Sequence, residues 1–256
     1  MTGMVFGWIK ARRRRKLLAI RAPREWARWL AEDLWFYRRL QRDDQWKLMD
    51  LSRVFIAEKH WEGREGLVLT DRIKLSIAAQ ACLLILHIEH DYYRRVGSIF
   101  VFPVMVGATM RFGNITEVLP ISGAASDGGP ILLCWDAVRG GAMNPTDGHN
   151  VVFHEFAHAL DYLDHYTDGT PPITGHTNFN RWVDVMTAHY QQLIEQVSAG
   201  RRSVLDDYGS VSPAEFFAVA TETFFEKPVP MKQQLPHLYE ILQDYFKQDP
   251  AGWRMV

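Results

Sequence analysis

Residues 148–166 read GHNVVFHEFAHALDYLDHY, and the interpretation of the whole chain starts from this stretch. His154 and His158 lie four residues apart, and Glu155 directly follows the first histidine. Most of the residues around them are apolar, which favours a buried helix. Because positions i and i+4 lie on one face of an α-helix, the two imidazoles can point toward one metal ion. Their nitrogens would then lie at the roughly 2.0–2.1 Å that zinc prefers.

The H-E-x-x-H pattern also suggests a role for the carboxylate. Glu155 lies about 100° around the helix from His154, so it stands beside the open coordination position and does not bind the ion. There it can take a proton from the attacking water, as the general base of a hydrolase does. The competing interpretation is a pair of hydrogen-bonded core histidines. An unpaired buried carboxylate is costly, and this cost favours the metal site.

A zinc hydrolase needs a third protein ligand, and two parts of the sequence offer one. One class places it ten residues after the first histidine, following a glycine that breaks the helix. Asp161 and Asp164 occupy the equivalent positions here, but the glycine is missing. Another class takes a glutamate from a later helix, and YGSVSPAEFFAVATETFFE (208–226) offers Glu215 in the first turn after a Ser-Pro start. Glu222 follows on the same face, where it can hold a ligand imidazole from behind if Glu215 binds the ion.

HEFAHALD together with YGSVSPAEFFAVATE resembles the Mlc titration factor A family of bacterial zinc peptidases. More distantly, the pair of motifs is similar to the catalytic domain of anthrax lethal factor. That domain also has a Tyr-Gly segment ahead of its glutamate ligand. The strand GPILLCWDAV before the H-E-x-x-H helix resembles the family too, so the similarity covers about residues 60–225.

The resemblance implies a gluzincin-type site with one zinc ion per chain. Its ligands would be His154, His158 and Glu215. Glu155 would be the general base, and Tyr208 would donate to the oxyanion, although Tyr208 can also be interpreted as a plain aromatic residue at a helix entrance. Family members are cytosolic, have aminopeptidase-like activity and are named for binding the sugar-uptake repressor Mlc. These properties are expectations for this chain.

Two further side chains are predicted to support the ligands from a second layer. They are Glu222, on the later helix, and Asp161, one turn beyond His158. Asp161 has a second interpretation, as a residue that forms hydrogen bonds at the end of the helix.

The order of segments predicts one α+β domain, mainly helical and zincin-like, with a small sheet and the H-E-x-x-H helix at its active site. Trp-rich helical segments and a long helix from Thr70 to about Tyr93 come first. Two strands follow, at 97–106 and 130–138, separated by a loop of weak strand character. The later helices are predicted at 147–163, 180–198, 213–226 and 236–247. Residues 1–59 are predicted to form a basic arm and helices packed on a peptidase domain at 60–256.

Composition narrows the class of protein further. The chain has 256 residues with a formal net charge of −1, so nucleic acid is not expected as a direct partner. Cys82 and Cys134 both lie in apolar runs, which favours a reducing, cytoplasmic setting over a disulfide framework. The apolar run 77–88 is shorter than the roughly twenty residues that a bilayer needs, so no membrane span is predicted.

The N-terminus is strongly basic, with eight Lys or Arg from Lys10 to Arg24 and no acid. A secretory signal has its basic residues before the apolar core, and here the order is reversed. The first interpretation is a solvated basic arm. The alternative is contact with an anionic membrane surface or an acidic partner.

The sequence therefore predicts a zinc metallopeptidase that acts on peptides, with Glu155 passing a proton from water to the leaving amine. The strand at 130–136 is expected to be an edge strand that pairs with extended substrate. The alternative is a regulatory, anti-repressor type of binding factor that contacts a transcriptional repressor and has a structural or vestigial zinc site. Glu155 argues against this alternative, because a site that only holds metal has no use for that carboxylate.

Overall fold

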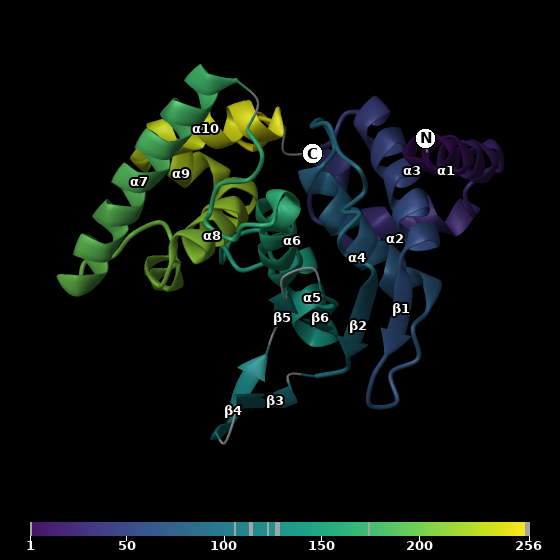
Figure 1. The fold of residues 1–256 in the computed structure, drawn as a ribbon, viewed down its shortest axis with the longest axis horizontal. Helices are drawn as coiled ribbons and strands as arrows, with labels where there is room; N and C mark the ends of the chain where they lie inside the picture. The colour runs from purple at the N-terminus through teal and green to yellow at the C-terminus, as the bar shows by residue number, and fades with distance from the viewer. Residues whose placement is uncertain are drawn as a thin grey trace.

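The computed structural model describes the backbone of residues 2–104, 106–112, 115–121, 123–125, 129–173 and 175–253. Side chains are described for residues 8–104, 129–173, 175 and 178–253. Most of this chain is helical, and a small sheet lies beside the helices (Figure 1). The predicted class, a mainly helical α+β fold with a small sheet, is confirmed.

The helices follow one another with short connections, and several carry the capping residues that the sequence suggested. Thr70 accepts the Ile73 amide at 3.3 Å at the start of α4, and Ser212 caps α8 with Pro213 in its first turn. The helices are α1 (Thr2–Ala19), α2 (Arg24–Asp33), α3 (Arg42–Glu58), α4 (Asp71–Leu84), α5 (Trp135–Met143), α6 (Val151–Asp161), α7 (His176–Ser198), α8 (Pro213–Glu226), α9 (Pro228–Gln234) and α10 (Pro236–Phe246). Single 3₁₀ turns are η1 (Tyr37–Arg39), η2 (Tyr162–Asp164), η3 (Asp207–Ser210) and η4 (Pro250–Gly252).

The main sheet has the strand order β1-β2-β6-β5. Its first three strands are parallel, with Ile99 opposite Ile131, and β5 runs antiparallel to β6 at the edge. A separate hairpin, β3–β4, projects from the end of this sheet (Figure 1). The strands are β1 (His60–Gly63), β2 (Ser98–Phe102), β3 (Val106–Phe112), β4 (Ile115–Ile121), β5 (Gly123–Ala125) and β6 (Ile131–Cys134).

Three predictions for this region were wrong. The strand expected at 130–138 ends at Cys134, because Trp135 begins α5. It is also not an edge strand, since β5 covers its outer side and would occupy the place proposed for substrate. The segment interpreted as a loop of weak strand character, residues 111–130, contains the end of β3 and all of β4 and β5. Helix α5 packs closely on the residue before α6, since a Cβ on Gly141 would meet Asn150 Cγ at 2.9 Å.

Helix α6 joins the two helical groups of the molecule, with α3 and α4 on one side and α8 on the other (Figure 1). Phe156 contacts the ring of Phe55 from α3, with centroids 5.6 Å apart. Phe153 contacts Phe225 from α8 at 5.3 Å. These four rings belong to one buried cluster, so the residues before 59 and those after it share a core. The division of the chain at residue 59 stays a prediction.

Helix α4 is buried along its length, as its apolar run predicts, but it stops at Leu84 and does not continue to Tyr93. Side chains from other parts of the fold satisfy carbonyls in its last turn. The Tyr93 hydroxyl donates to Ala81 O at 2.8 Å, and Gln248 Nε2 donates to Leu83 O at 2.9 Å. The helix can therefore end inside the core without leaving these groups unpaired. No helix among the described residues is both long and apolar enough to cross a membrane.

The basic N-terminal run forms helix α1, which is docked on α3. Arg14 makes a two-point contact with the Glu58 carboxylate at 2.7 and 2.8 Å. From α3, the buried Arg53 donates to Leu17 O at 2.6 Å and to Ile20 O, two carbonyls at the end of α1. A guanidinium thus closes the C-terminal end of α1, where cations are favourable.

We predict that Arg53→Met lowers the free energy of unfolding by about 1–3 kcal/mol, the cost of leaving buried acceptors without a donor. Methionine retains most of the packing of the aliphatic stem but cannot donate to the carbonyls of Leu17 and Ile20. Guanidinium unfolding followed by circular dichroism measures the change. Arg42→Met, an exposed position on the same helix, is the control and should stay within about 0.5 kcal/mol of wild type. Equal stability of the two variants would contradict this account of the α1 contact.

Candidate metal centre

Two imidazoles from α6 face the same point. Asn150 caps this helix, since its Oδ1 accepts the amides of Val152 and Phe153 at 3.1 Å each. Four residues of helix then bring His154 Nε2 and His158 Nε2 to 3.2 Å from each other. Both side chains are largely buried, with exposed fractions of 15% and 13%. The i, i+4 pairing expected from the sequence is present.

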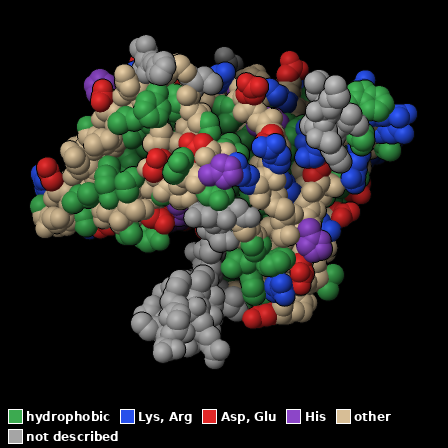
Figure 2. Space-filling view, in the orientation of Figure 1, with side chains coloured by type: hydrophobic (Ala, Val, Ile, Leu, Met, Phe, Trp, Pro, Cys, Tyr) green, Lys and Arg blue, Asp and Glu red, His purple; other side chains and the backbone are tan. Residues whose placement is uncertain are grey.

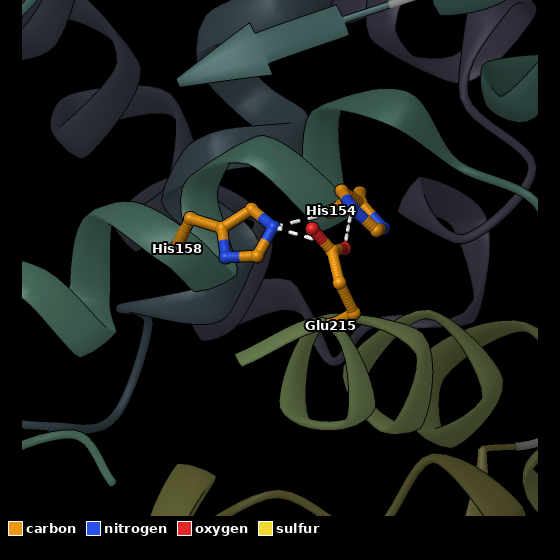
Figure 3. Close-up of side chains that lie close together, drawn as sticks. All are labelled: His154, His158 and Glu215. Carbon is orange, nitrogen blue, oxygen red and sulfur yellow. Dashed lines mark hydrogen bonds and ion pairs between the residues drawn. The ribbon is translucent and has the colours of Figure 1, made fainter. Parts of the chain in front are cut away.

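Glu215 reaches the same point from α8, which packs against α6 (Figure 3). Its Oε2 lies 3.0 Å from His154 Nε2 and 3.4 Å from His158 Nε2. The Ser212 hydroxyl accepts the Glu215 amide at 3.2 Å, so this glutamate sits in the first turn of its helix, as the Ser-Pro start predicts. The three side chains form a group of donors able to hold a metal ion.

The dimensions of this triangle fit a tetrahedral ion. Ligands at 2.0–2.1 Å in a tetrahedral arrangement are about 3.3–3.4 Å apart. The three donor atoms are separated by 3.0, 3.2 and 3.4 Å. Two imidazoles and one carboxylate are a donor set typical of catalytic zinc sites, whereas structural zinc sites normally have four protein ligands.

The hydrogen bonds of His154 indicate that this cluster favours a positive charge. Glu222 Oε1 lies 2.7 Å from His154 Nδ1, so a neutral imidazole here donates from Nδ1 and has its lone pair on Nε2. That lone pair then faces the Glu215 carboxylate at 3.0 Å, and a cation between them removes the repulsion. Burial lowers the pKa of His154, but hydrogen bonds to Glu215 and Glu222 outweigh it and raise the pKa to about 10. The cluster therefore attracts positive charge.

Glu215 shows the matching effect. Burial raises the pKa of this carboxyl, but hydrogen bonds from His154 and His158 outweigh burial and lower the pKa to about 2. The group is thus ionised over the whole physiological range, as a metal ligand must be.

Glu155 and Tyr208 flank the three donors. Glu155 lies on α6 between the two histidines and is only 4% exposed. Tyr208 lies on η3, where the Asp206 side chain accepts its amide at 2.8 Å, and its ring centroid is 6.0 Å from that of His154. Burial raises the pKa of Tyr208, and the charges of Glu215 and Glu155 raise it further. The phenol therefore keeps its proton and can donate it in a hydrogen bond.

The two aspartates considered from the sequence lie differently. Asp164 accepts the Tyr166 amide at 3.0 Å beyond the end of α6 and is not among the described donors that face the site. Asp161 is fully buried and accepts the Gly169 amide at 2.8 Å. It anchors the loop that passes over the start of α8, where a Cβ on Gly169 would lie 2.3 Å from Pro213 O. This contact matches the helix-end interpretation of Asp161.

The two imidazoles differ in their hydrogen bonding at Nδ1. His154 Nδ1 is held by Glu222, as proposed for that glutamate from the sequence. His158 Nδ1 is buried and has no hydrogen-bond partner among the described side chains. Asp161 does not fill that role, although it lies one helical turn away. A role for Asp161 in supporting the ligands stays a prediction without a direct contact.

A buried network behind Glu222 was not found by sequence reasoning. The Asn150 backbone amide donates to Glu222 Oε2 at 2.5 Å. Asn150 Nδ2 donates to Gln80 Oε1 on α4 at 2.9 Å and to Glu226 Oε1 on α8 at 3.1 Å. One asparagine thus caps α6 and joins it to two other helices. A polar residue directly before the apolar run was the available signal, but its partners lie 70 or more residues away.

Comparison with known proteins gives a family match over most of the chain. The sequence profile of the family described as "Glucose-regulated metallo-peptidase M90" matches residues 8–247. An uncharacterized protein of Synechocystis, slr2042, is 34% identical over 93% of this chain and 89% of its own length. Proteins named Mlc titration factor A are more distant: that of Serratia proteamaculans is 27% identical over 83% of both chains, and that of Pectobacterium atrosepticum is 28% identical over 83% and 82%.

We predict a clear order among three alanine variants. Glu215→Ala should lose the metal at nanomolar free zinc. Glu222→Ala should weaken binding by about 10–100-fold, because it removes only the hydrogen bond that orients the His154 imidazole. Asp164→Ala should leave affinity unchanged. Titration against a zinc-buffering chelator ranks the three variants, with elemental analysis as a check. If Asp164→Ala strips the metal while Glu215→Ala retains it, the ligand set is wrong.

The network makes a separate prediction about pH. Burial raises the pKa of Glu226 to about 9, from an ordinary 4.5. Between these values the folded protein holds a proton that the unfolded chain releases, so the free energy of unfolding falls as pH rises. The wild-type protein loses up to about 1.4 kcal/mol of unfolding free energy per pH unit in this range. Glu226→Gln keeps a neutral side chain and should not show this loss.

The advantage of Glu226→Gln over wild type should therefore grow from pH 5 to pH 9 in guanidinium unfolding of chelator-treated protein. Glu240→Gln, on an exposed face of α10, is the control and should show no such trend. A constant difference between Glu226→Gln and wild type across this range would show that Glu226 is ionised in the folded protein.

Proposed function

The chain belongs to the glucose-regulated metallo-peptidase M90 family, and from this premise we propose that it is a zinc-dependent peptidase with Glu155 as its general base. A metallopeptidase type of function follows from the family. The observation that carries the finer proposal is the triangle of donor atoms from His154, His158 and Glu215, with sides of 3.0–3.4 Å. We assign these three residues as the ligands of one zinc ion per chain, a gluzincin-type site.

Zinc is preferred for this site on chemical grounds. Imidazole nitrogen with a single carboxylate oxygen suits zinc better than magnesium or calcium, which favour all-oxygen sites. A bound zinc ion supplies a Lewis acid that polarises the peptide carbonyl and makes water more acidic. The role of this chain's own residues is to hold the ion, to move protons and to bind the carbonyl oxygen.

Glu155 moves the proton in this proposal. Its carboxylate accepts a proton from water as the water oxygen bonds to the carbonyl carbon. The same carboxyl then gives the proton to the amine nitrogen as the C–N bond breaks, so one water molecule is added across the peptide bond. Glu155 is 4% exposed and directly follows His154 on α6, and its charge contributes to the raised pKa of His154; these observations support the role proposed for it.

Tyr208 would bind the carbonyl oxygen as negative charge develops on it. The phenol keeps its proton, because burial and the charges of Glu215 and Glu155 raise its pKa. Its side chain is 52% exposed, so substrate can reach it from solvent. A donor in this position typically contributes about 10²–10³-fold to the rate.

The proposal extends to substrate and setting. We propose peptide substrates, cleaved in an aminopeptidase-like manner, as the family resemblance suggests. A cytoplasmic location is supported by Cys82 and Cys134, which are both free and buried. Relatives named Mlc titration factor A suggest a repressor as a further partner, and this part of the proposal rests on their names alone.

The alternative function is a regulatory binding factor of the anti-repressor type with a structural or vestigial zinc site. The names of the relatives favour it. The buried Glu155 beside an open donor triangle argues against it, because a structural site normally has four protein ligands.

We predict that Glu155→Gln binds zinc at one ion per chain and folds normally but loses about 10²–10⁴-fold or more in peptide hydrolysis. Glutamine has nearly the same shape but cannot accept the proton. The measurement combines elemental analysis with a fluorogenic peptide assay. Glu195→Gln, an exposed position on α7, is the matched control and should retain full activity. Unchanged peptide hydrolysis by Glu155→Gln would contradict the mechanism. Wild-type protein that holds one zinc ion per chain but hydrolyses no peptide would favour the regulatory binding factor.

A further inference from the structure

Helix α1 has two faces of different character. The inner face contacts α3 through Arg14 and Lys10, which lie 2.7 Å and 3.6 Å from the Glu58 carboxylate, and it also includes the partly buried Leu17 and Leu18. The outer face points to solvent. At 100° per residue, positions 8, 9, 12, 13, 15 and 16 all fall on this outer face. We call these six residues the basic face: Trp8, Ile9, Arg12, Arg13, Arg15 and Lys16.

The basic face holds four cations that the fold does not use. All four side chains are exposed, and within the described part of the chain none of them makes an ion pair. Arg12 lies over the Trp8 ring at 5.6 Å from its centroid. In the space-filling view, Lys and Arg side chains gather at the edge of the molecule where α1 lies (Figure 2). A positive patch of this density stands out on a chain with a net charge of −1.

The same face exposes two large apolar side chains at its N-terminal end. Trp8 is 59% exposed and Ile9 is 52% exposed. In sequence they follow the apolar residues Met4, Val5 and Phe6. Exposed tryptophan and isoleucine beside a cluster of cations can both be accommodated at a lipid surface, with tryptophan at the level of the headgroups and the cations on anionic lipid.

We propose that α1 is a peripheral membrane anchor, which binds anionic phospholipid headgroups through Arg12, Arg13, Arg15 and Lys16 and places Trp8 and Ile9 in the interface. Clusters of four to eight Lys or Arg residues are typical of such contacts. Nucleic acid would satisfy the cations equally well, but it offers nothing for an exposed isoleucine. An anionic lipid surface accounts for both the four cations and the two exposed apolar side chains.

The contacts between α1 and α3 attach the proposed anchor to the rest of the protein. Glu58 and Arg53 of α3 hold the middle and the C-terminal end of α1, so this part of the helix is fixed to the fold. The neighbouring helices run in the order α1, α3, α4, α6. A membrane bound at α1 would therefore lie two helices away from the metal centre and leave Glu215 and Tyr208 open to substrate.

Sedimentation with vesicles tests the proposal on the full-length protein. The probe is phosphatidylcholine alone against a 70:30 mixture of phosphatidylcholine and phosphatidylglycerol, at about 0.1 M salt. Wild type should bind only the anionic vesicles. The triple variant Arg12→Gln, Arg13→Gln, Arg15→Gln should bind about 100-fold more weakly, at about fivefold for each cation lost. Higher salt should weaken wild-type binding because it screens the charges.

A matched triple variant controls for charge in general. Arg201→Gln, Arg202→Gln, Lys247→Gln removes three exposed cations from the opposite, α7–α10 side of the molecule, and should bind within about twofold of wild type. A second variant, Trp8→Ala with Ile9→Ala, should also lose affinity although its charge is unchanged. Melting curves verify that each variant folds, and peptide hydrolysis by all of them should match wild type. The outcome is therefore independent of the proposed peptidase mechanism.

Three results would overturn the proposal. The first is no binding of wild type to anionic vesicles. The second is an equal loss in the control triple variant, which would reduce the effect to overall charge. The third is a duplex or single-stranded oligonucleotide that binds through the basic face while vesicles do not, which would make nucleic acid the partner.

Discussion

The Asn150 backbone amide donates to Glu222 at 2.5 Å, and the geometry of the metal centre depends on this contact. Glu222 in turn holds His154 Nδ1 and so leaves Nε2 to face Glu215. The same Asn150 caps α6 and contacts Gln80 on α4. Asn150 thus sets both the start of α6 and the orientation of the His154 imidazole. A shift in the start of the helix would therefore displace the imidazole. Second-layer contacts of this kind orient ligands in most metal sites.

This arrangement buries several acidic side chains, and they differ in ionisation and hydrogen bonding. Glu215 remains ionised because two imidazoles hold its pKa near 2. Burial raises the pKa of Glu226 to about 9, so this side chain is neutral at physiological pH. Asp161 receives a backbone amide from Gly169. Of these three carboxyl groups only Glu215 belongs to the donor triangle, so a bound cation would offset the cost of burying that carboxylate alone.

The donor triangle and the basic face of α1 lie in different parts of the molecule. The donor triangle lies where α6 meets α8, in the middle of the fold, and the basic face of α1 lies at one edge (Figure 1). The helices between them share one hydrophobic cluster, in which Phe55 contacts Phe156 and Phe153 contacts Phe225. A packed core of this kind fixes the position of one surface relative to the other.

The sequence alone determined those features of the candidate site that depend on local helix geometry. Helical periodicity places His154 and His158 on one face, and the Ser212-Pro213 start places Glu215 in a first turn, because both features depend on a few neighbouring residues. The choice of Glu215 over Asp164 as the candidate third ligand already needed a resemblance to a family, since spacing left both open. The ligand roles themselves are still predictions.

Only the tertiary structure decided which distant groups meet. Gln80, Asn150 and Glu226 come together across 70 or more residues, and no pattern in any one segment predicts that contact. The early end of α4 follows from the contacts of Tyr93 and Gln248 with its last carbonyls. The outer face of α1 was equally hidden, because it is defined by the side chains that contact Glu58. These features depend on packing between elements, which the periodicity of a single element does not encode.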